Sequence, residues 1–400
     1  MRILLVSWEY PPIVVGGLGR HVYALSRELA AQGHDVLVVT RGESSSAVTE
    51  RHDGVRVLRA ARDPLALDFS TETLLSWAQA SEHALLRAAL PALRRWRPDV
   101  IHAHDWLVAQ TAVTLSEITS ARLVTTIHAT EAGRNLGWLP APLNTAIHSV
   151  ERWLIERSQA VITCSAAMRT EVTDLFGAVD RITVVPNGID VDTWRVSAAA
   201  RRAARRRYRG DAALLAYAGR LVHEKGVQDL LDALPTLRRR HPGLRLVVAG
   251  TGVHESELQA HARRRRLGNA VQWLGFVPEP ELATILAAAD VVVVPSHYEP
   301  FGIVALEAAA VRTPLVVAAT GGLQDLVDAG MVAGSFPPGD VAGLTNAVHA
   351  TLTCAEDTRR AVNRGARVIR RDYAWPVVAE RTASVYRAAS SLSSGSVDPS

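Results

Sequence analysis

The sequence is poor in lysine and cysteine and has no long apolar run. Lysine occurs once, at Lys225, although the chain has 44 basic residues, so nearly all of its positive charge is arginine. The two cysteines, Cys164 and Cys354, have neither the spacing of a disulfide framework nor a neighbouring histidine cluster that would indicate a metal site. Apolar stretches stay well short of the ~18 residues that a membrane-spanning helix needs. These absences argue against a disulfide-stapled secreted domain and against an integral membrane protein.

The start of the chain also lacks the marks of a signal peptide. Residues 1–7 are apolar but have no basic start and no small-residue cleavage site, so we expect a cytoplasmic protein. The chain has a net charge of +4 and a pI of 9.4, which favours anionic ligands or surfaces without choosing among them. Arginine runs at residues 201–209 and 263–266 are typical of solvated helix faces; weak contact with a membrane surface or an acidic partner is the alternative. We expect no nucleic-acid partner, and the oligomeric state stays open.

Strand and helix patterns alternate through both halves of the 400-residue chain, which is long enough for two domains. Apolar runs typical of buried parallel strands occur first at residues 2–7, 34–40, 54–58, 100–103, 123–127 and 160–165. They resume at residues 213–218, 244–249, 271–274, 290–295 and 314–319, followed by helical patterns at 226–240, 254–266, 279–289, 301–311, 322–329 and 340–353. This alternation predicts an α/β fold with two Rossmann-like, doubly wound domains.

The texture of the sequence changes near its middle. Residues 187–212 begin with a turn and continue with an Ala/Arg-rich stretch that has no sheet pattern, so we place the interdomain linker there. The predicted domains are therefore residues 1–190 and 191–375. The Ser/Gly-rich residues 390–400 are predicted to form a disordered tail.

Two cations follow the first strand of the second domain. In open parallel sheets, ligands bind at the carboxyl ends of the strands. Arg220 and Lys225 lie there, on a loop that leads into a helix. Two positive charges at a helix N-terminus suit a diphosphate, whose negative charge increases when an attached sugar leaves. We expect Lys225 to face solvent on this loop; two ordinary surface charges are the alternative.

Two glutamates follow the strand at residues 290–295. Glu299 precedes a helix and Glu307 lies two turns inside it, so both can point toward the same end of the sheet. Glu307 stands in the apolar stretch 304–310, where a carboxylate is costly unless it binds something. We therefore expect both to bind a ligand, with surface acids on an exposed helix as the alternative.

The first domain has a glycine-rich turn after its first strand. Gly16, Gly17 and Gly19 open a helix, where backbone amides can approach a phosphate. The dinucleotide fingerprint is incomplete, because Val22 stands where its third glycine belongs. The turn alone is equally consistent with packing.

Histidines end two further strands of the first domain. The strand alternation sends His102 and His104 to the same face, but nothing else in the sequence completes a metal-ligand set. Recognition of sugar hydroxyls by Asp105 and His128 fits these residues better. Core or supporting roles are the alternative.

Together, these motifs resemble the glycogen-synthase-like retaining glycosyltransferases of the GT-B fold, whose second domain carries two glutamates separated by seven residues. The matching segments span nearly the whole chain in the expected order: 7–12, 16–19, 104–106, 128–131, 186–190, 220–225 and 299–307. Within the family, the sequence is most similar to bacterial α-1,4-glucosyltransferases that make glycogen and methylglucose lipopolysaccharide. The resemblance implies two domains with a cleft between them and a final helix, about 376–389, that returns to the first domain.

The resemblance also implies residue roles. Arg220 and Lys225 would neutralise the donor diphosphate, Glu307 would hold the ribose, and Glu299 a donor-sugar hydroxyl. The implied catalytic set is Glu299, His128, Arg220, Lys225 and Asp105. The implied donor contacts are Gly16, Gly17, Asn187, Arg220, Lys225, Glu299, Gly302, Ile303, Glu307, Gly321 and Gly322, the last two through backbone amides. The implied acceptor contacts are Glu9, Tyr10 and Asp105. The family needs no metal and no other cofactor.

We therefore expect retaining transfer of glucose from ADP- or UDP-glucose to an α-1,4-glucan or related oligosaccharide. Glycogen synthases proper often carry a lysine just before the glycine loop, where this chain has Val15, so the nucleotide stays open. The nearest rival is a GDP-mannose-dependent mannosyltransferase acting on a lipid or glycolipid acceptor, although the stretch 128–131 favours the glucan. A sugar-nucleotide epimerase and a non-catalytic glucan-binding module are the rivals from other classes.

Overall fold

The computed structural model describes residues 1–65, 67–177, 179–208 and 212–391, and the chain divides into two compact units. Unit 1 contains Met1–Gly188 together with the segment from Trp375 onward, and unit 2 contains Ile189–Ala374. The predicted boundary after residue 190 lies two residues beyond this division. The C-terminal helix α15 (Trp375–Ser391) overlaps the start of the predicted tail, and residues 392–400 lie outside the described part of the chain.

Unit 1 is built on an eight-stranded sheet with the strand order β3-β4-β2-β1-β5-β6-β7-β8. Neighbouring strands run parallel except β3 and β4, which are antiparallel. The strands are β1 (Arg2–Val6), β2 (Asp35–Arg41), β3 (Val48–His52), β4 (Val55–Ala60), β5 (Val100–His104), β6 (Arg122–Ile127), β7 (Ala160–Thr163) and β8 (Ile182–Val184). The central strand β1 is an apolar run after Arg2, because helices cover both faces of the sheet.

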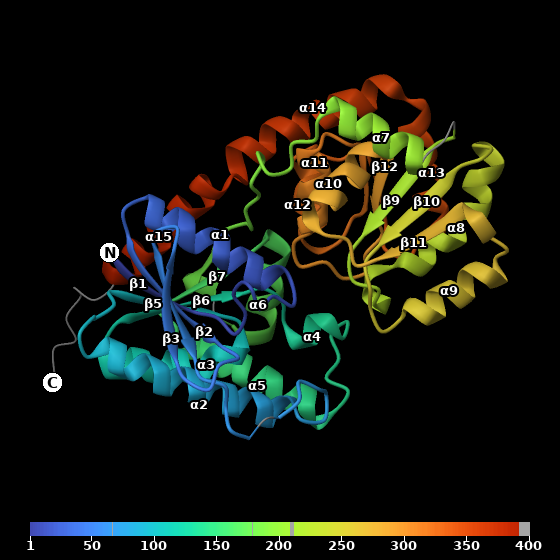
Figure 1. The fold of residues 1–400 in the computed structure, drawn as a ribbon. Helices are drawn as coiled ribbons and strands as arrows, with labels where there is room; N and C mark the ends of the chain where they lie inside the picture. The colour runs from blue at the N-terminus through green and yellow to red at the C-terminus, as the bar shows by residue number, and fades with distance from the viewer. Residues whose placement is uncertain (66, 178, 209–211, 392–400) are drawn as a thin grey trace. The chain divides into compact units, whose positions relative to one another are not determined.

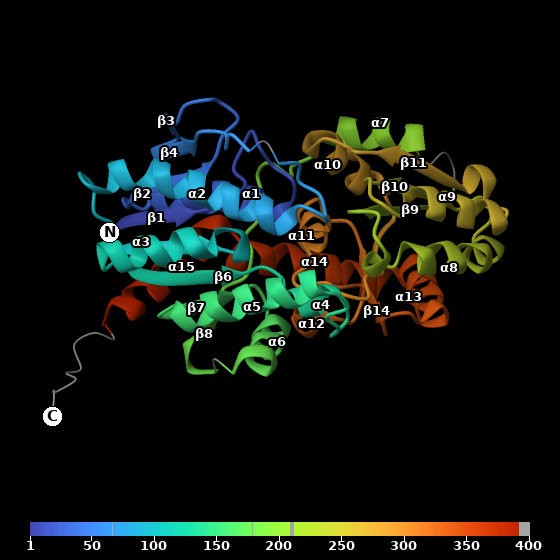
Figure 2. The same ribbon diagram turned by 90° about the horizontal axis from the view of Figure 1, so that it is seen from below.

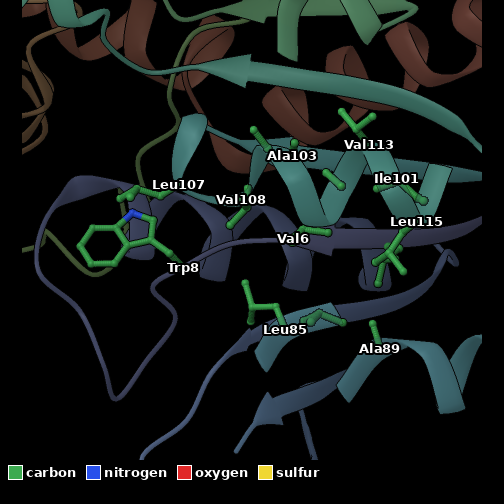
Figure 3. Packing of buried hydrophobic residues seen from close by; sticks show 14 of the residues in the cluster. Val6, Trp8, Leu85, Ala89, Ile101, Ala103, Leu107, Val108, Val113 and Leu115 are labelled. Atoms are coloured by element: carbon green, nitrogen blue, oxygen red, sulfur yellow. The ribbon is translucent and has the colours of Figure 1, made fainter. Parts of the chain in front are cut away.

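Helices cover both faces of this sheet (Figure 1). The side chains buried beneath them form two separate clusters, one on each face. Alternate side chains of β1 point to opposite faces, so Leu4 and Val6 join one cluster while Ile3 and Leu5 join the other. Figure 3 shows part of the first cluster, in which Val6 lies among side chains of β5, α2 and α3. The helices of unit 1 are α1 (Gly17–Ala31), α2 (Leu74–Leu93), α3 (Ala109–Thr119), α4 (Glu131–Arg134), α5 (Pro142–Arg157) and α6 (Ala166–Phe176), with α15 packed beside α1.

Unit 2 has a six-stranded parallel sheet in the order β11-β10-β9-β12-β13-β14 (Figure 2). Its strands are β9 (Leu214–Ala218), β10 (Arg245–Ala249), β11 (Val271–Gly275), β12 (Val291–Val294), β13 (Leu315–Ala318) and β14 (Gly334–Phe336). Its helices are α7 (Ala198–Tyr208), α8 (Val227–Arg240), α9 (Glu255–Arg264), α10 (Glu279–Ala288), α11 (Ile303–Ala310), α12 (Gly321–Asp328), α13 (Val341–Thr353) and α14 (Ala355–Asp372). None of the described helices of either unit is long and apolar enough to cross a membrane.

The prediction that the Ala/Arg-rich stretch belongs to an interdomain linker is wrong. Residues 198–208 form helix α7, which belongs to unit 2 and packs against α10. Ala204 and Tyr208, one helical turn apart, are buried on its inner face. Arg205 pairs with Asp290 at 3.3 Å. The stretch lacks a sheet pattern because it is an arginine-covered amphipathic helix.

The chain passes from one unit to the other at two adjacent points of its fold. In unit 2, the amide of Ile189 donates to the carbonyl of Tyr373 at 2.8 Å. In unit 1, Gly188 lies against Trp375 so tightly that an added Cβ would lie 2.4 Å from the indole Cδ2. Only glycine fits there.

Candidate active site

Lys225 and Glu299 form an ion pair at the carboxyl end of the unit 2 sheet. They lie on the loops that follow β9 and β12, whose strands are neighbours. Lys225 Nζ donates to Glu299 Oε2 at 2.8 Å, and the two side chains are 15% and 16% exposed. The prediction that Lys225 faces solvent is therefore wrong: the ammonium is largely enclosed because Glu299 holds it. The fold brings the two residues together across 74 positions of sequence.

The two loops are held against each other by contacts beside this pair. The amide of His297 donates to the carbonyl of Glu224 at 2.8 Å, and His297 Nε2 lies 2.6 Å from Asp229 Oδ2. Gly226 has a φ of +67°, and a Cβ there would lie 1.9 Å from the carbonyl oxygen of Pro295. A glycine at 226 is thus required for the close approach that positions Lys225.

The glycine pair at the start of α12 supports Glu299. The amide of Gly322 donates to the Glu299 carbonyl at 2.8 Å, and a Cβ on Gly321 would lie 2.0 Å from that same oxygen. The Gly322 amide thus already has an acceptor within the protein, and its predicted donor contact stays a prediction. The glycines let α12 approach the loop closely enough to fix Glu299.

The remaining donor candidates of unit 2 lie nearby in the chain but differ in exposure. Gly302, at a φ of +98°, precedes α11, which begins at Ile303. Glu307 is 2% exposed, as expected for a carboxylate in an apolar helix. Arg220 is 64% exposed and lies 3.5 Å from Glu224. Arg220 is thus free to move toward a ligand, whereas Glu307 is fixed in the core.

In unit 1, the glycine-rich turn wraps around a buried carboxylate. Glu9, 2% exposed, accepts hydrogen bonds through Oε2 from the amides of Val15 at 2.6 Å and Gly16 at 2.9 Å. The Gly16 amide is thus already bonded to Glu9, and its predicted role in binding a phosphate stays a prediction. Gly17 begins α1, directly after the loop. Glu9 therefore holds the turn in place, a role different from its predicted contact with an acceptor.

Tyr10 is a core residue. Its side chain is 1% exposed, its hydroxyl lies 3.1 Å from Ser26 Oγ, and its ring packs edge-on against Tyr23. Burial raises the pKa of Tyr10 to about 12. The ring is enclosed by the core, and the predicted contact between Tyr10 and an acceptor stays a prediction.

Three histidines from separate elements of unit 1 meet at the carboxyl end of its sheet. His21 comes from α1, His104 from the end of β5 and His128 from the residue after β6, and one nitrogen of each lies within 4.8 Å of the others. His104 Nδ1 and His128 Nε2 are 3.2 Å apart. Burial lowers the pKa of all three imidazoles, that of His128 to about 3, so the rings are neutral.

His102 lies beneath this group and is fully satisfied. The centre of its ring lies 4.2 Å from that of His104, at a tilt of 38°, which confirms that the two share a face of the sheet. Its two nitrogens lie 2.7 Å from Tyr386 Oη of α15 and 2.7 Å from Thr126 Oγ1. His102 is a supporting residue of the core.

Asp105 holds the backbone of His128. Its Oδ1 accepts the His128 amide at 2.7 Å, and its own backbone has a φ of +61°, a strained conformation that is concentrated at functional sites. Burial raises the pKa of Asp105 to about 6. The charge of Arg134 and the hydrogen bonds that Asp105 accepts from backbone amides act in the opposite direction. The contact that the structure gives Asp105 is therefore with His128, and its predicted sugar contact stays a prediction.

Comparison with known proteins identifies the family. The model described as "Glycosyltransferase Family 4" matches residues 15–193, and that described as "Glycosyl transferases group 1" matches residues 201–368. A protein named glycogen synthase from Mycobacterium tuberculosis is 48% identical over 97% of this chain and 95% of its own length. The chain belongs to these glycosyltransferases.

Solved structures of the same architecture include two plant-type or cyanobacterial synthases. Sucrose-phosphate synthase from Thermosynechococcus elongatus matches with a TM-score of 0.84 and 24% identity over 98% of this chain and all of its own. The catalytic domain of starch synthase IV from Arabidopsis thaliana, bound to ADP and acarbose, matches with a TM-score of 0.78 and 21% identity. The match covers 98% of this chain and 99% of that domain. The predicted GT-B architecture is confirmed, and the mannosyltransferase and epimerase alternatives are not favoured.

Three residues at the candidate sites of this glycosyltransferase were missed in the sequence. His21 lies 83 positions before His104, inside a helix, and Asp229 lies 68 positions before His297. Glu151 accepts the amide of Glu131 at 2.8 Å, and burial raises its pKa to about 8. A buried polar residue on an amphipathic helix was the available signal for all three. Asn187, a predicted donor contact, is 6% exposed, and its Oδ1 has no partner among the described residues.

Proposed function

We propose that this glycosyltransferase moves glucose from ADP- or UDP-glucose to an α-1,4-glucan or related oligosaccharide, with retention at the anomeric carbon. The observation that carries the proposal is the 48% identity, over 97% of the chain, to a protein named glycogen synthase. The chain also shares its fold with a starch synthase whose structure holds ADP and acarbose. In this proposal unit 2 binds the donor and unit 1 the acceptor.

The Lys225–Glu299 pair supplies the chemistry of donor binding. In the ligand-free protein, the ammonium is neutralised by a carboxylate 2.8 Å away. A donor diphosphate within reach of Lys225 competes for that charge and frees Glu299 to accept a sugar hydroxyl. When the bond from the anomeric carbon to phosphate breaks, negative charge grows on the diphosphate, and Lys225 with the exposed Arg220 stabilises it.

His128 contributes to the sugar side of the reaction as a neutral group. A positively charged imidazole near the anomeric carbon would oppose an oxocarbenium-like state, whereas burial keeps His128 uncharged. Asp105 holds the His128 backbone and so orients the ring. Because protein cations neutralise the leaving group, we propose that transfer needs no metal cofactor.

The test is a panel of five sugar nucleotides, offered with and without maltooligosaccharides in the presence of a chelator. We expect acceptor-dependent release of diphosphate with ADP- or UDP-glucose and an α-1,4-linked product by NMR. Glu299→Gln should abolish most of this activity. Glu257→Gln is the matched control, because Glu257 is 71% exposed in the same unit.

Three outcomes would overturn the proposal. Preference for GDP-mannose would favour the mannosyltransferase, and conversion of the donor without acceptor would favour the epimerase. Glucan binding that does not depend on any nucleotide would indicate a binding module.

A further inference from the structure

The three-histidine group of unit 1 has the composition of a transition-metal site. Each imidazole comes from a different element, so the fold alone brings His21, His104 and His128 within ligand distance of one another. In tetrahedral zinc sites the Zn–N distance is ~2.0–2.1 Å, which places ligand nitrogens about 3.4 Å apart. The 3.2 Å between His104 Nδ1 and His128 Nε2 matches this spacing. His21, within 4.8 Å, completes the set by a small side-chain movement.

Unpaired buried nitrogens in this group are a second, independent observation. His21 is 6% exposed and His104 0%, yet His21 Nδ1 and His104 Nε2 have no hydrogen-bond partner among the described residues. Asn187, whose Oδ1 has no partner among the described residues either, lies beside His21 and raises the pKa of that imidazole against the effect of burial. Buried polar atoms in folded proteins are normally paired, so the unpaired His21 Nδ1 is available to a ligand.

The protonation chemistry of the group suits a metal. Metal binding needs neutral imidazoles, and burial already lowers the pKa of all three rings. Coordination through His104 Nδ1 and His128 Nε2 moves the shared proton to a distal nitrogen, such as the unpaired His104 Nε2. The ion therefore has no protonated histidine to displace at neutral pH.

We propose that His21, His104 and His128 bind a first-row transition-metal ion of the zinc class, and that this ion inhibits the enzyme by occupying His128. Three imidazole ligands with an open fourth position favour Zn²⁺, Cu²⁺ or Ni²⁺ over Mg²⁺ or Ca²⁺, which prefer oxygen ligands. His128 is partly exposed, so the ion can enter beside it. The binding claim stands without the proposed function, whereas the inhibition claim rests on it.

Binding is tested with full-length protein that carries no polyhistidine tag. Equilibrium dialysis with Zn²⁺ and the visible absorption of bound Co²⁺ are measured for wild type, His21→Gln, His128→Asn and His349→Gln. The last is the matched control, because His349 lies in unit 2 with its Nδ1 2.9 Å from His241 Nε2 and has no part in the group. Thermal melts establish that each variant is folded.

We expect one Zn²⁺ per wild-type chain, with affinity reduced at least tenfold by His21→Gln and by His128→Asn and unchanged by His349→Gln. Tetrahedral Co²⁺ bands should weaken in the same two variants. Absence of stoichiometric binding in wild type, or equal affinity in all four proteins, would overturn the site.

Inhibition is tested in the glucosyl-transfer assay. Zn²⁺ should inhibit wild type and His349→Gln at the same concentrations. Inhibition of His21→Gln should need at least tenfold more Zn²⁺, and Mg²⁺ should have no effect. Equal Zn²⁺ sensitivity of wild type and His21→Gln would overturn the inhibitory role. A wild-type protein that transfers no sugar under any condition would count against the proposed function and leave the dialysis result intact.

Discussion

Replacing Glu82 with glutamine should stabilise the protein above neutral pH and change little at pH 5. Glu82 lies on α2 with 5% of its surface exposed, and its Oε2 accepts the Thr111 amide at 2.7 Å. Burial raises the pKa of this carboxyl from 4.5 to about 7. The folded protein therefore holds a proton there that the unfolded chain releases once the pH exceeds 4.5.

The sign and size of this pH dependence follow from the linkage between proton binding and folding. Between pH 4.5 and 7 the unfolded state gains stability because Glu82 ionises there. The contribution of Glu82 to the free energy of unfolding therefore falls as the pH rises and is fully lost above 7. A shift of about 2.5 pKa units corresponds to about 3 kcal/mol at 1.36 kcal/mol per unit. Glutamine cannot ionise, and its side-chain oxygen can still accept the Thr111 amide, so the variant avoids this loss.

The assay is urea unfolding by circular dichroism at several pH values from 5 to 8. The gap in unfolding free energy between Glu82→Gln and wild type should widen by about 3 kcal/mol toward pH 8. Glu117→Gln is the control, because Glu117 is 59% exposed on the same unit and its ion pair with Arg157 contributes little. Parallel pH profiles for Glu82→Gln and wild type would mean that Glu82 is already ionised in the folded protein, and the reasoning would fail.

Four further substitutions probe the donor-site residues and the packing of Gly188. Lys225→Arg should lower kcat by roughly tenfold, because a broad, planar guanidinium has little room where the Lys225 side chain is only 15% exposed, and Lys225→Ala should lower it further because the charge is lost. Full activity in Lys225→Arg would show that any cation serves at this position. Glu307→Gln should raise the KM for the donor more than that for the acceptor, and unchanged donor affinity in calorimetry would remove Glu307 from the site. Gly188→Ala should destabilise unit 1 by about 1–3 kcal/mol, since its Cβ would meet Trp375 at 2.4 Å; a wild-type urea profile would show that the indole moves aside freely.

Buried strands and the loops that follow them could be predicted from the sequence because apolar runs mark strands covered on both faces. β3 was missed because it is an exposed edge strand with the sequence VTERH, and β8 and β14 because each has three residues. The long helix α14 was also missed; it is strongly amphipathic, and its segment was not assigned.

Within the sites, motif spacing located Lys225 and Glu299 but gave no account of their mutual contact. The burial of Tyr10 could not be read from its motif, because the ring fills the core and the hydroxyl lies 3.1 Å from Ser26 Oγ only in the folded chain. His21 could not be connected with His104 and His128, because only the packing of α1 on the sheet brings it there. Side-chain partners between distant elements are a property of the tertiary fold.

The core that α15 completes has a consequence for synthesis on the ribosome. Ile3 and Leu5 of β1 pack in one cluster with Val378, Ala383 and Tyr386 of α15. Unit 2 is a continuous stretch of chain translated between these two parts, so it can fold while one face of the unit 1 sheet still lacks its last helix. The unit that is translated first is thus the last to be completed. During this interval its uncovered apolar face is a target for chaperones and for aggregation, and truncation before Trp375 would make that state permanent.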